Sequence, residues 1–477
     1  MTFVRLRTLL TPLAVALSLS LAALQGAHAQ DSTATLHYKG ITLQPVGFVA
    51  AEFVWRQRNL TADIGSSYNA IPFSGTTNGN MTEARLTGRQ SRIGLLATGN
   101  AGSTKVTGFW ESDFLTVGTT SNSNESNSYA LRIRQFFLSA AMNNGWTISG
   151  GQMWSLVTPS KVGMNPRSEA VPLTIEAQYA VGFNWERQAG IRFVNKMSDE
   201  SSFGIALEES QSTFSARNAP ANFVIGQAGG SLLNATTTYS TDYSPDLVAK
   251  LAFDPKGAGH WELKAVGSSF RDRVIDPTNV SGGTRNATNY GYGLGFGVYV
   301  PINSDGRDVM DFGLSGLWGQ GIGRYGTVTL PDVTVGSDGT LKPIKASQVM
   351  LSLETHPTKD LDIYSYIGAE YADRTAFTNA AGKGVGYGSE LNVNTGCQTE
   401  AAPTNQTTPN SGTCAADTRA VWQANLGFWY RFYKGAAGTV QWGMQYSYTS
   451  RNTWSGGGIQ PQAIDNMLFS SFRYVLP

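Results

Sequence analysis

The sequence has little charge, few cysteines and histidines, and almost no long apolar run. Charged residues make up 14% of the 477 residues, whereas about 25% is usual in globular proteins. The 35 Lys and Arg nearly balance the 34 Asp and Glu, which argues against a nucleic-acid partner. After residue 30 no apolar run is long enough for a membrane-spanning helix. These shortages disfavour a nucleic-acid-binding protein, a helical membrane protein and an ordinary highly charged soluble domain.

Only two cysteines occur, Cys397 and Cys414. Their separation excludes the Cys-x-x-Cys spacing of zinc and redox sites, and we expect neither a cofactor nor a metal. In an exported chain such a pair is most simply a disulfide across one surface loop. Loop entropy suggests about 3 kcal/mol of stabilisation from this bond.

The first residues have the pattern of an export signal. Arg5 and Arg7 precede an apolar run over 9–24, and Ala27-His28-Ala29 has the form of a cleavage site. We therefore predict that residues 1–29 are a cleaved secretory signal. A membrane-anchoring helix is the weaker alternative, because Pro12 interrupts the run. Residues 30–45 are then a short periplasmic segment that precedes the folded part, 46–477.

Glycine and aromatic residues are plentiful, with 54 glycines and 11% aromatic residues. The stretch 419–454 shows their arrangement best. Trp422, Phe428 and Tyr430 share one face at a period of two, and Gln423 and Asn425 share the other. This alternation predicts an amphipathic β-hairpin with its turn at 434–438. Its aromatic face suits either a soluble core or a lipid bilayer, so the choice depends on the rest of the chain.

The rest of the chain repeats the alternation in about sixteen segments of barrel-strand length. Short turns, such as 100–104 and 143–145, alternate with long polar connections, such as 157–187 and 375–417. A soluble sandwich has no reason to sort its connections in this way. The pattern predicts an all-β fold, an up-and-down antiparallel β-barrel in outer-membrane lipid, with both termini and the short turns in the periplasm.

Charged residues on these strands fall in the phase opposite to the apolar one. An arginine facing lipid near the bilayer centre costs about 2 to 4 kcal/mol, so this phase must face the lumen. Two interpretations stay open: arginines facing carboxylates across the pore create a transverse field, or neighbouring strands pair the charges locally. The predicted pore-lining residues are Glu52, Arg56, Arg58, Arg92, Glu111, Asp113, Arg132, Arg134 and Arg192.

Several motifs resemble one known family. They are SRIGLLATG (91–99), GFWESDF (108–114), LRIRQFFLSA (131–140), GQMWSLVTP (151–159) and WGQGIGRY (318–325). Together they resemble the DcaP-like porins of Gram-negative outer membranes.

The resemblance implies a sixteen-stranded, generally trimeric channel for passive diffusion of small hydrophilic solutes. It also implies a lumen lined by charged and aromatic side chains and narrowed by an inward loop after the fifth strand. Two features depart from the family. Residues 30–45 are too short for its N-terminal coiled coil, and the sequence ends in Pro477 where Phe or Trp is usual.

The segment 159–179 follows the fifth predicted strand and is the candidate constriction loop. Its possible pore-facing groups are Lys161, Arg167, Glu169 and Glu176. A plain extracellular loop is the alternative.

Histidine is too sparse for most enzymatic barrels. His37 precedes the predicted barrel, and His260 and His356 lie beside short turns, away from the long loops. We therefore expect no enzyme. Fewer than twenty residues precede the first strand of the exported chain, too few for a plug domain. A structural or adhesin-type barrel that binds partners through its long loops remains the alternative function.

Overall fold

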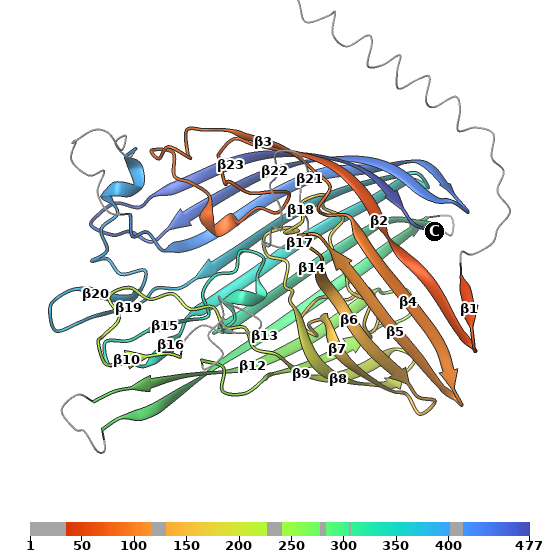
Figure 1. Ribbon diagram of the computed structural model, residues 1–477, viewed down its shortest axis with the longest axis horizontal. Helices are drawn as coiled ribbons and strands as arrows, with labels where there is room; N and C mark the ends of the chain where they lie inside the picture. The colour runs from red at the N-terminus through yellow and green to blue at the C-terminus, as the bar shows by residue number, and fades with distance from the viewer. Residues whose placement is uncertain (1–34, 116–129, 227–240, 277–282, 305–306, 401–413) are drawn as a thin grey trace, which may run out of the picture.

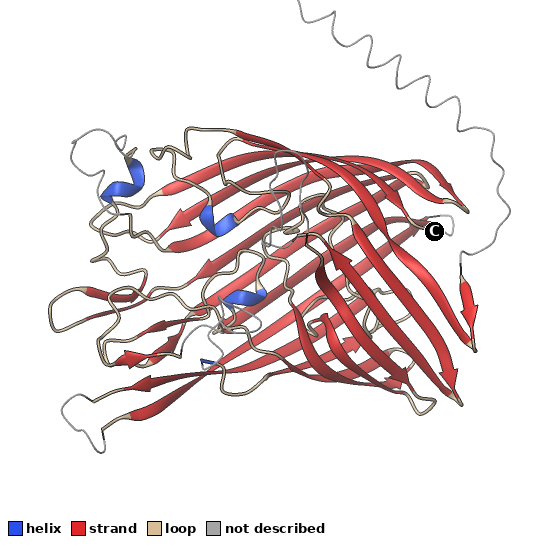
Figure 2. Ribbon diagram, viewed as in Figure 1, coloured by secondary structure: helices blue, strands red, loops and turns tan. Residues whose placement is uncertain are grey.

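The computed structural model describes residues 35–115, 130–226, 241–276, 283–304, 307–400 and 414–477. Within them the chain forms a closed barrel of sixteen antiparallel strands, as the alternation predicted (Figures 1 and 2). The predicted export signal, 1–29, lies outside the described residues. No helix in the described part is long and apolar enough to cross a membrane.

Each barrel strand pairs with the next along the chain, and β23 pairs with β2 to close the ring. The sixteen strands are β2 (Ile41–Arg56), β4 (Arg92–Ala101), β5 (Thr104–Asp113), β6 (Arg132–Ala141), β7 (Trp146–Trp154), β8 (Arg187–Ser198), β9 (Ser201–Glu208), β11 (Asp246–Phe253), β12 (His260–Val274), β13 (Arg285–Ser304), β14 (Arg307–Gln320), β17 (Lys345–Thr358), β18 (Leu361–Ala372), β21 (Thr418–Gly435), β22 (Gly438–Thr453) and β23 (Gln462–Val475).

Shorter elements extend this wall or lie in the connections. The added strands are β1 (Leu36–Tyr38) and β3 (Glu83–Thr87), both paired with β2, β10 (Phe223–Val224), paired with β12, and the small hairpins β15 (Val333–Val335) with β16 (Leu341–Pro343) and β19 (Thr375–Thr378) with β20 (Gly384–Tyr387). Among the described residues the short 3₁₀ helices are η2 (Tyr68–Ala70), η4 (Gly323–Tyr325) and η5 (Thr395–Gln398).

The first strand begins earlier than the sequence predicted. We placed the start of the barrel at residue 46, but β2 begins at Ile41, and Ile41 pairs with Gly99 of β4. Pro45 stands opposite Leu95 inside this strand and obscures the alternation in the sequence. At the other end of β2, Glu52 to Arg56 pair with β3.

The strands turn apolar side chains outward and polar side chains inward. In the hairpin β21–β22, Leu426 is 59% exposed and Tyr430 is 42% exposed, whereas Gln423 and Gln445 are buried. The same alternation runs along β17, where Leu351 and Leu353 are exposed. An exposed apolar surface of this extent suits lipid rather than water. The hairpin's aromatic face is therefore the outside of the barrel.

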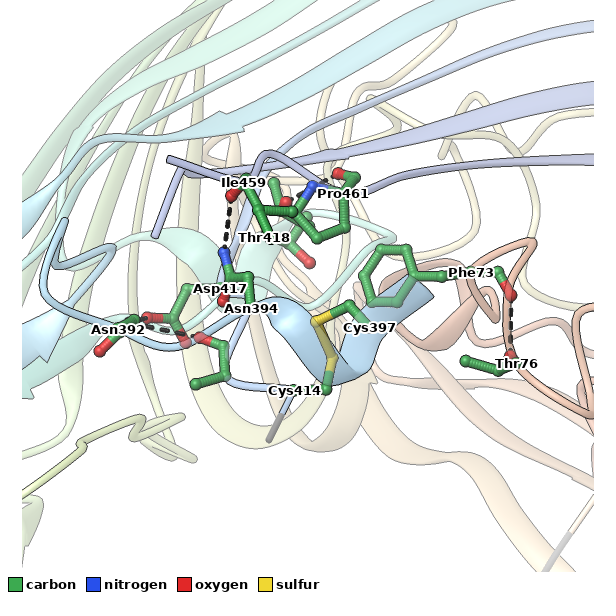
Figure 3. The surroundings of a disulfide bond; sticks show 12 residues. Phe73, Thr76, Asn392, Asn394, Cys397, Cys414, Asp417, Thr418, Ile459 and Pro461 are labelled. Atoms are coloured by element: carbon green, nitrogen blue, oxygen red, sulfur yellow. Dashed lines mark hydrogen bonds between the residues drawn. A yellow bond between two sulfur atoms is a disulfide. The ribbon is translucent and has the colours of Figure 1, made fainter. Parts of the chain in front are cut away.

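The connections are sorted between the two ends of the barrel. Short turns, such as 102–103 and 436–437, lie at the end that also holds the C-terminus, and the long connections lie at the other end (Figure 1). Cys397 and Cys414, in the long connection 373–417, form the predicted disulfide, with their Cα atoms 4.6 Å apart. Cys397 is buried in the same hydrophobic cluster as Phe73, which lies in the connection after β2 (Figure 3). The disulfide therefore lies in a loop that packs against another connection.

Candidate functional site

The connection 155–186, between β7 and β8, crosses the interior of the barrel. The Trp429 indole N–H donates to the Leu173 carbonyl (2.8 Å), and the Ile175 N–H donates to the Gln445 side-chain carbonyl (2.7 Å). The Val181 N–H donates to the Gln423 side chain (3.1 Å). Trp429 and Gln423 belong to β21, which lies eight strands from β8 in the sixteen-strand ring. The segment expected to constrict the lumen thus reaches the opposite wall.

Two other connections enter the barrel and pack against this segment. In 57–82, Ile64 and Tyr68 are fully buried, and Ser66 bonds to Glu176. In 321–344, Val328 N–H donates to the Glu370 carboxylate of β18, which also accepts from Gly182 N–H (2.9 Å). We call 57–82, 155–186 and 321–344 the inward segments.

The alternating pattern of 309–325 predicts one continuous strand, and the third inward segment corrects this prediction. Strand β14 ends at Gln320. Gly321 then adopts a φ of +68°, and η4 follows. The positive φ favours glycine and turns the chain inward. Arg324 of η4 is buried and pairs with Asp246, Asp332 and Glu186.

The four predicted constriction residues have different surroundings. Lys161 keeps 44% of its side chain exposed, and its ammonium pairs with Asp311 of β14 (3.1 Å) and Glu354 of β17 (3.0 Å). Arg167 is exposed and lies over the Phe109 ring, 4.8 Å from its centre. Glu169 is half-buried and one of its oxygens accepts no hydrogen bond from the described residues.

Glu176 corrects our expectation, because it is buried and does not face a lumen. Its carboxylate accepts hydrogen bonds from the Ser66 N–H (2.9 Å) and hydroxyl (2.7 Å). Burial raises the pKa of Glu176, although Arg56 opposes the shift. This residue fastens two inward segments to each other.

The predicted arginines and carboxylates of β4, β5 and β6 form one cluster on the inner wall. Arg134 bonds to both Glu111 and Asp113 at 2.8 Å. Arg132 bonds to Asp113 at 2.8 Å, and Arg92 lies 3.7 Å from Glu111. The charges therefore pair between neighbouring strands, as the local interpretation expected. Arg132 keeps 38% of its side chain exposed, so pairing does not remove it from solvent.

The other predicted pore-lining residues are buried by their contacts inside the barrel. Glu52 pairs with Arg473 (2.8 Å), and Arg56 pairs with Glu83 (2.9 Å). Arg58 donates to the Gly79 carbonyl (2.7 Å). Arg192 donates to the Met164 and Trp154 carbonyls. Glu52, Arg56 and Arg192 point into the barrel as their phase required, whereas Arg58 lies beyond the end of β2, in the inward segment 57–82. All four are buried and hold the wall and inward segments rather than line an open lumen.

Tyr179 and Arg187, which the sequence did not predict as site residues, adjoin this cluster. The Tyr179 hydroxyl accepts hydrogen bonds from Arg134 (2.9 Å) and Arg187 (3.3 Å). Arg187 also stacks on Trp154 and Trp185, with centroid distances of 4.8 and 4.9 Å. Among the described residues no carboxylate lies within ion-pair distance of Arg187. Arg187 is the first residue of β8 and Tyr179 lies in a loop, so alternation gave no signal for either.

We call Arg92, Arg132, Arg134, Arg187, Glu111 and Asp113 the arginine cluster. Its four guanidinium groups exceed its two carboxylates by two positive charges. Burial raises the pKa of the Tyr179 phenol, but nearby guanidinium groups outweigh burial and lower that pKa to about 8. Arg132 and Arg187 line a cavity of about 260 Å³, together with Gln178 and Trp185. The cluster thus presents positive charge to a cavity that has room for several water molecules.

Comparisons with known proteins bear on the fold. No protein-family model matches the sequence, and no curated protein sequence matches it significantly. The structure superposes on the outer membrane channel DcaP of Acinetobacter baumannii with a TM-score of 0.63 and 18% identity, covering 92% of this chain and 99% of that one. The anion-selective porin of Comamonas acidovorans gives a TM-score of 0.46 and 11% identity, over 91% of this chain and 100% of that one. The chain therefore has the fold of the DcaP channel, a closed sixteen-stranded antiparallel β-barrel.

Proposed function

We propose that this protein is an outer-membrane channel through which small hydrophilic solutes diffuse passively. The observation that carries the proposal is a closed barrel, apolar outside, whose polar interior is narrowed by three inward segments. Closing the sheet into a barrel pairs the backbone N–H and C=O groups of neighbouring strands all the way round, so no unpaired strand edge faces lipid. The similarity to the DcaP fold supports the same function. Export by a cleaved signal and assembly as a homotrimer belong to the proposal, and the family resemblance supports the trimer.

The arginine cluster adds a selectivity to this proposal. Its excess of two positive charges lies where water can reach Arg132 and Arg187. Fixed charge in a narrow, low-dielectric passage concentrates ions of opposite sign. The channel therefore favours anionic over cationic solutes.

Reconstitution into planar bilayers tests both statements. The mature chain, folded in detergent, should produce stepwise conductance, and its reversal potential in asymmetric KCl should show preference for chloride. Folding is checked separately by a heat-induced shift in gel mobility. A folded barrel that gives no conductance would overturn the channel and favour the partner-binding alternative. Conductance with cation preference would overturn only the selectivity.

A further inference from the structure

Two β-bulges lie on neighbouring strands at the short-turn end of the barrel. On β14, Met310 pairs with Ile302 and Asp308 pairs with Asn303, so Val309 is an extra residue. On β17, the three steps from Thr355 to Thr358 stand opposite only two steps, from Ile363 to Leu361, on β18, so β17 also carries one extra residue. A bulge re-aims the side chains beside it, and bulges are common next to functional sites. Asp308 and Asp311, three residues apart, can therefore face the same point.

Three potential metal ligands meet at these bulges. Asp308, Asp311 and His356 each offer a ligand atom, and the three atoms lie within 4.8 Å of one another. His356 Nε2 lies 3.8 Å from Asp311 Oδ2. Around a tetrahedral metal with bonds of about 2.0–2.1 Å, ligand atoms are roughly 3.3 Å apart. Side-chain movements of the order of an ångström would close these atoms around one ion.

The other ring nitrogen of His356 is held by a buried carboxylate. His356 Nδ1 lies 2.8 Å from Asp362 Oδ1, and Arg431 bonds to the second Asp362 oxygen. An ionised carboxylate only accepts hydrogen bonds, so Nδ1 carries the proton and Nε2 keeps its lone pair when the ring is neutral. Histidines that bind metals commonly have this second partner, which orients the ring. Asp362 thus presents Nε2 toward Asp308 and Asp311.

The charges around this point leave room for a divalent cation. Asp308, Asp311, Glu354 and Asp362 supply four negative charges, whereas Lys161 and Arg431 supply two positive charges. With a neutral His356 ring the balance is two negative charges. The Lys161 ammonium, from an inward segment, lies 3.1 Å from Asp311 and already neutralises part of this negative charge.

We propose that Asp308, Asp311 and His356 bind a divalent first-row transition-metal ion, of which Zn²⁺ is the probe, and that Asp362 positions His356. The imidazole nitrogen with two carboxylates suits Zn²⁺ and its neighbours better than Mg²⁺ or Ca²⁺, which prefer all-oxygen sites. The ion would compete with Lys161 for Asp311, which links its binding to an inward segment. The sequence alone predicted no metal, because His356 lies on a different strand from the two aspartates and the bulges that unite them are not visible in the pattern.

Calorimetric titration of the folded, full mature chain with ZnCl₂ tests this proposal. The protein carries no histidine tag and is first treated with a chelator. His356→Ala and Asp308→Asn should each weaken Zn²⁺ binding at least tenfold, whereas His37→Ala, a histidine on β1, should leave it unchanged. Asp362→Asn should weaken binding roughly 10- to 100-fold, as expected for a residue that orients a ligand.

Lys161→Met guards against loss of binding through misfolding, because it should tighten Zn²⁺ binding by removing a competing cation. Equal Zn²⁺ affinity in the wild type, His356→Ala and Asp308→Asn would overturn the site. Binding of Mg²⁺ or Ca²⁺ as tight as that of Zn²⁺ would overturn the choice of metal class. Co²⁺ in place of Zn²⁺ should give visible absorption bands that disappear in His356→Ala.

Discussion

The two sides of the barrel interior use polar groups differently. On β4, β5 and β6, charged side chains pair with one another, and Arg132, with Arg187 at the start of β8, lines a cavity that water can reach. On β18, β21 and β22, Glu370, Gln423 and Gln445 accept hydrogen bonds from the backbone of the inward segments. The first wall can act on a passing solute, whereas the second fixes the shape of the passage. Selectivity and pore size should therefore respond to different substitutions.

The largest effect should come from Arg134, which holds both carboxylates of the arginine cluster. Arg134→Leu leaves Glu111 and Asp113 without their shared buried partner and should lower the free energy of unfolding by about 3 to 5 kcal/mol. Guanidinium-induced unfolding in phospholipid vesicles, followed by tryptophan fluorescence, measures this loss. Arg132→Gln is the matched control. Its side chain is partly exposed, so its loss should change stability by less than about 1 kcal/mol.

The next largest effect should come from Glu370, on the wall of β18, β21 and β22 whose side chains hold the inward segments. Glu370→Ala deprives Gly182 N–H and Val328 N–H of their acceptor and should destabilise the folded state by about 1 to 3 kcal/mol. Because both inward segments lose an anchor, single-channel current should also become noisier and larger on average. Glu370→Gln keeps an acceptor oxygen and should stay close to wild type. Unaltered current in Glu370→Ala would show that this wall does not set the pore size.

Substitutions in the arginine cluster should change the ion selectivity of the channel rather than the size of its pore. Arg187→Gln removes a guanidinium that has no carboxylate partner among the described residues, and it should reduce the chloride-to-potassium permeability ratio roughly two-fold, about 0.4 kcal/mol. Reversal potentials in asymmetric KCl provide the measurement. Arg285→Gln, at the start of β13 and away from the cluster, serves as control. An equal change in both variants would show that the arginine cluster does not set the ion selectivity.

The smallest effect should be a dependence on pH. Since the pKa of Tyr179 is lowered to about 8, its phenol is neutral below that pH and negative above it. Chloride preference should therefore fall between pH 7 and 9, as the cluster loses net positive charge. Tyr179→Phe should abolish the change in this range. A persistent change in Tyr179→Phe would assign the titration to another group.

Local alternation was enough to predict what the strands do. The outward face of β21–β22, the inward phase of Arg92 and Arg134, and the number of strands all follow from a period of two and from the cost of charge in lipid. The disulfide followed from having only one pair of cysteines.

Contacts between distant segments could not be predicted in this way. The partnership of Glu176 with Ser66, and the meeting of Tyr179 with Arg187 and Arg134, depend on how loops pack inside the closed barrel. The end of β14 at Gln320 was missed because Ile322 keeps the phase of Trp318, although the backbone turns inward at Gly321. The sequence thus showed which side chains face the barrel interior, but not which of them the inward segments cover.

The seam between β2 and β23 dictates the order in which the molecule can be assembled. Phe48 pairs with Val475, so the contact closes a loop of more than four hundred residues. Closing a flexible loop of that length costs about 5 kcal/mol of chain entropy, against about 2 kcal/mol for a ten-residue hairpin. Neighbouring strands can therefore register first and the seam last. Until that final step the backbone N–H and C=O groups along one edge of β2 and of β23 stay unpaired, so the unfinished sheet has two open edges that the finished barrel lacks.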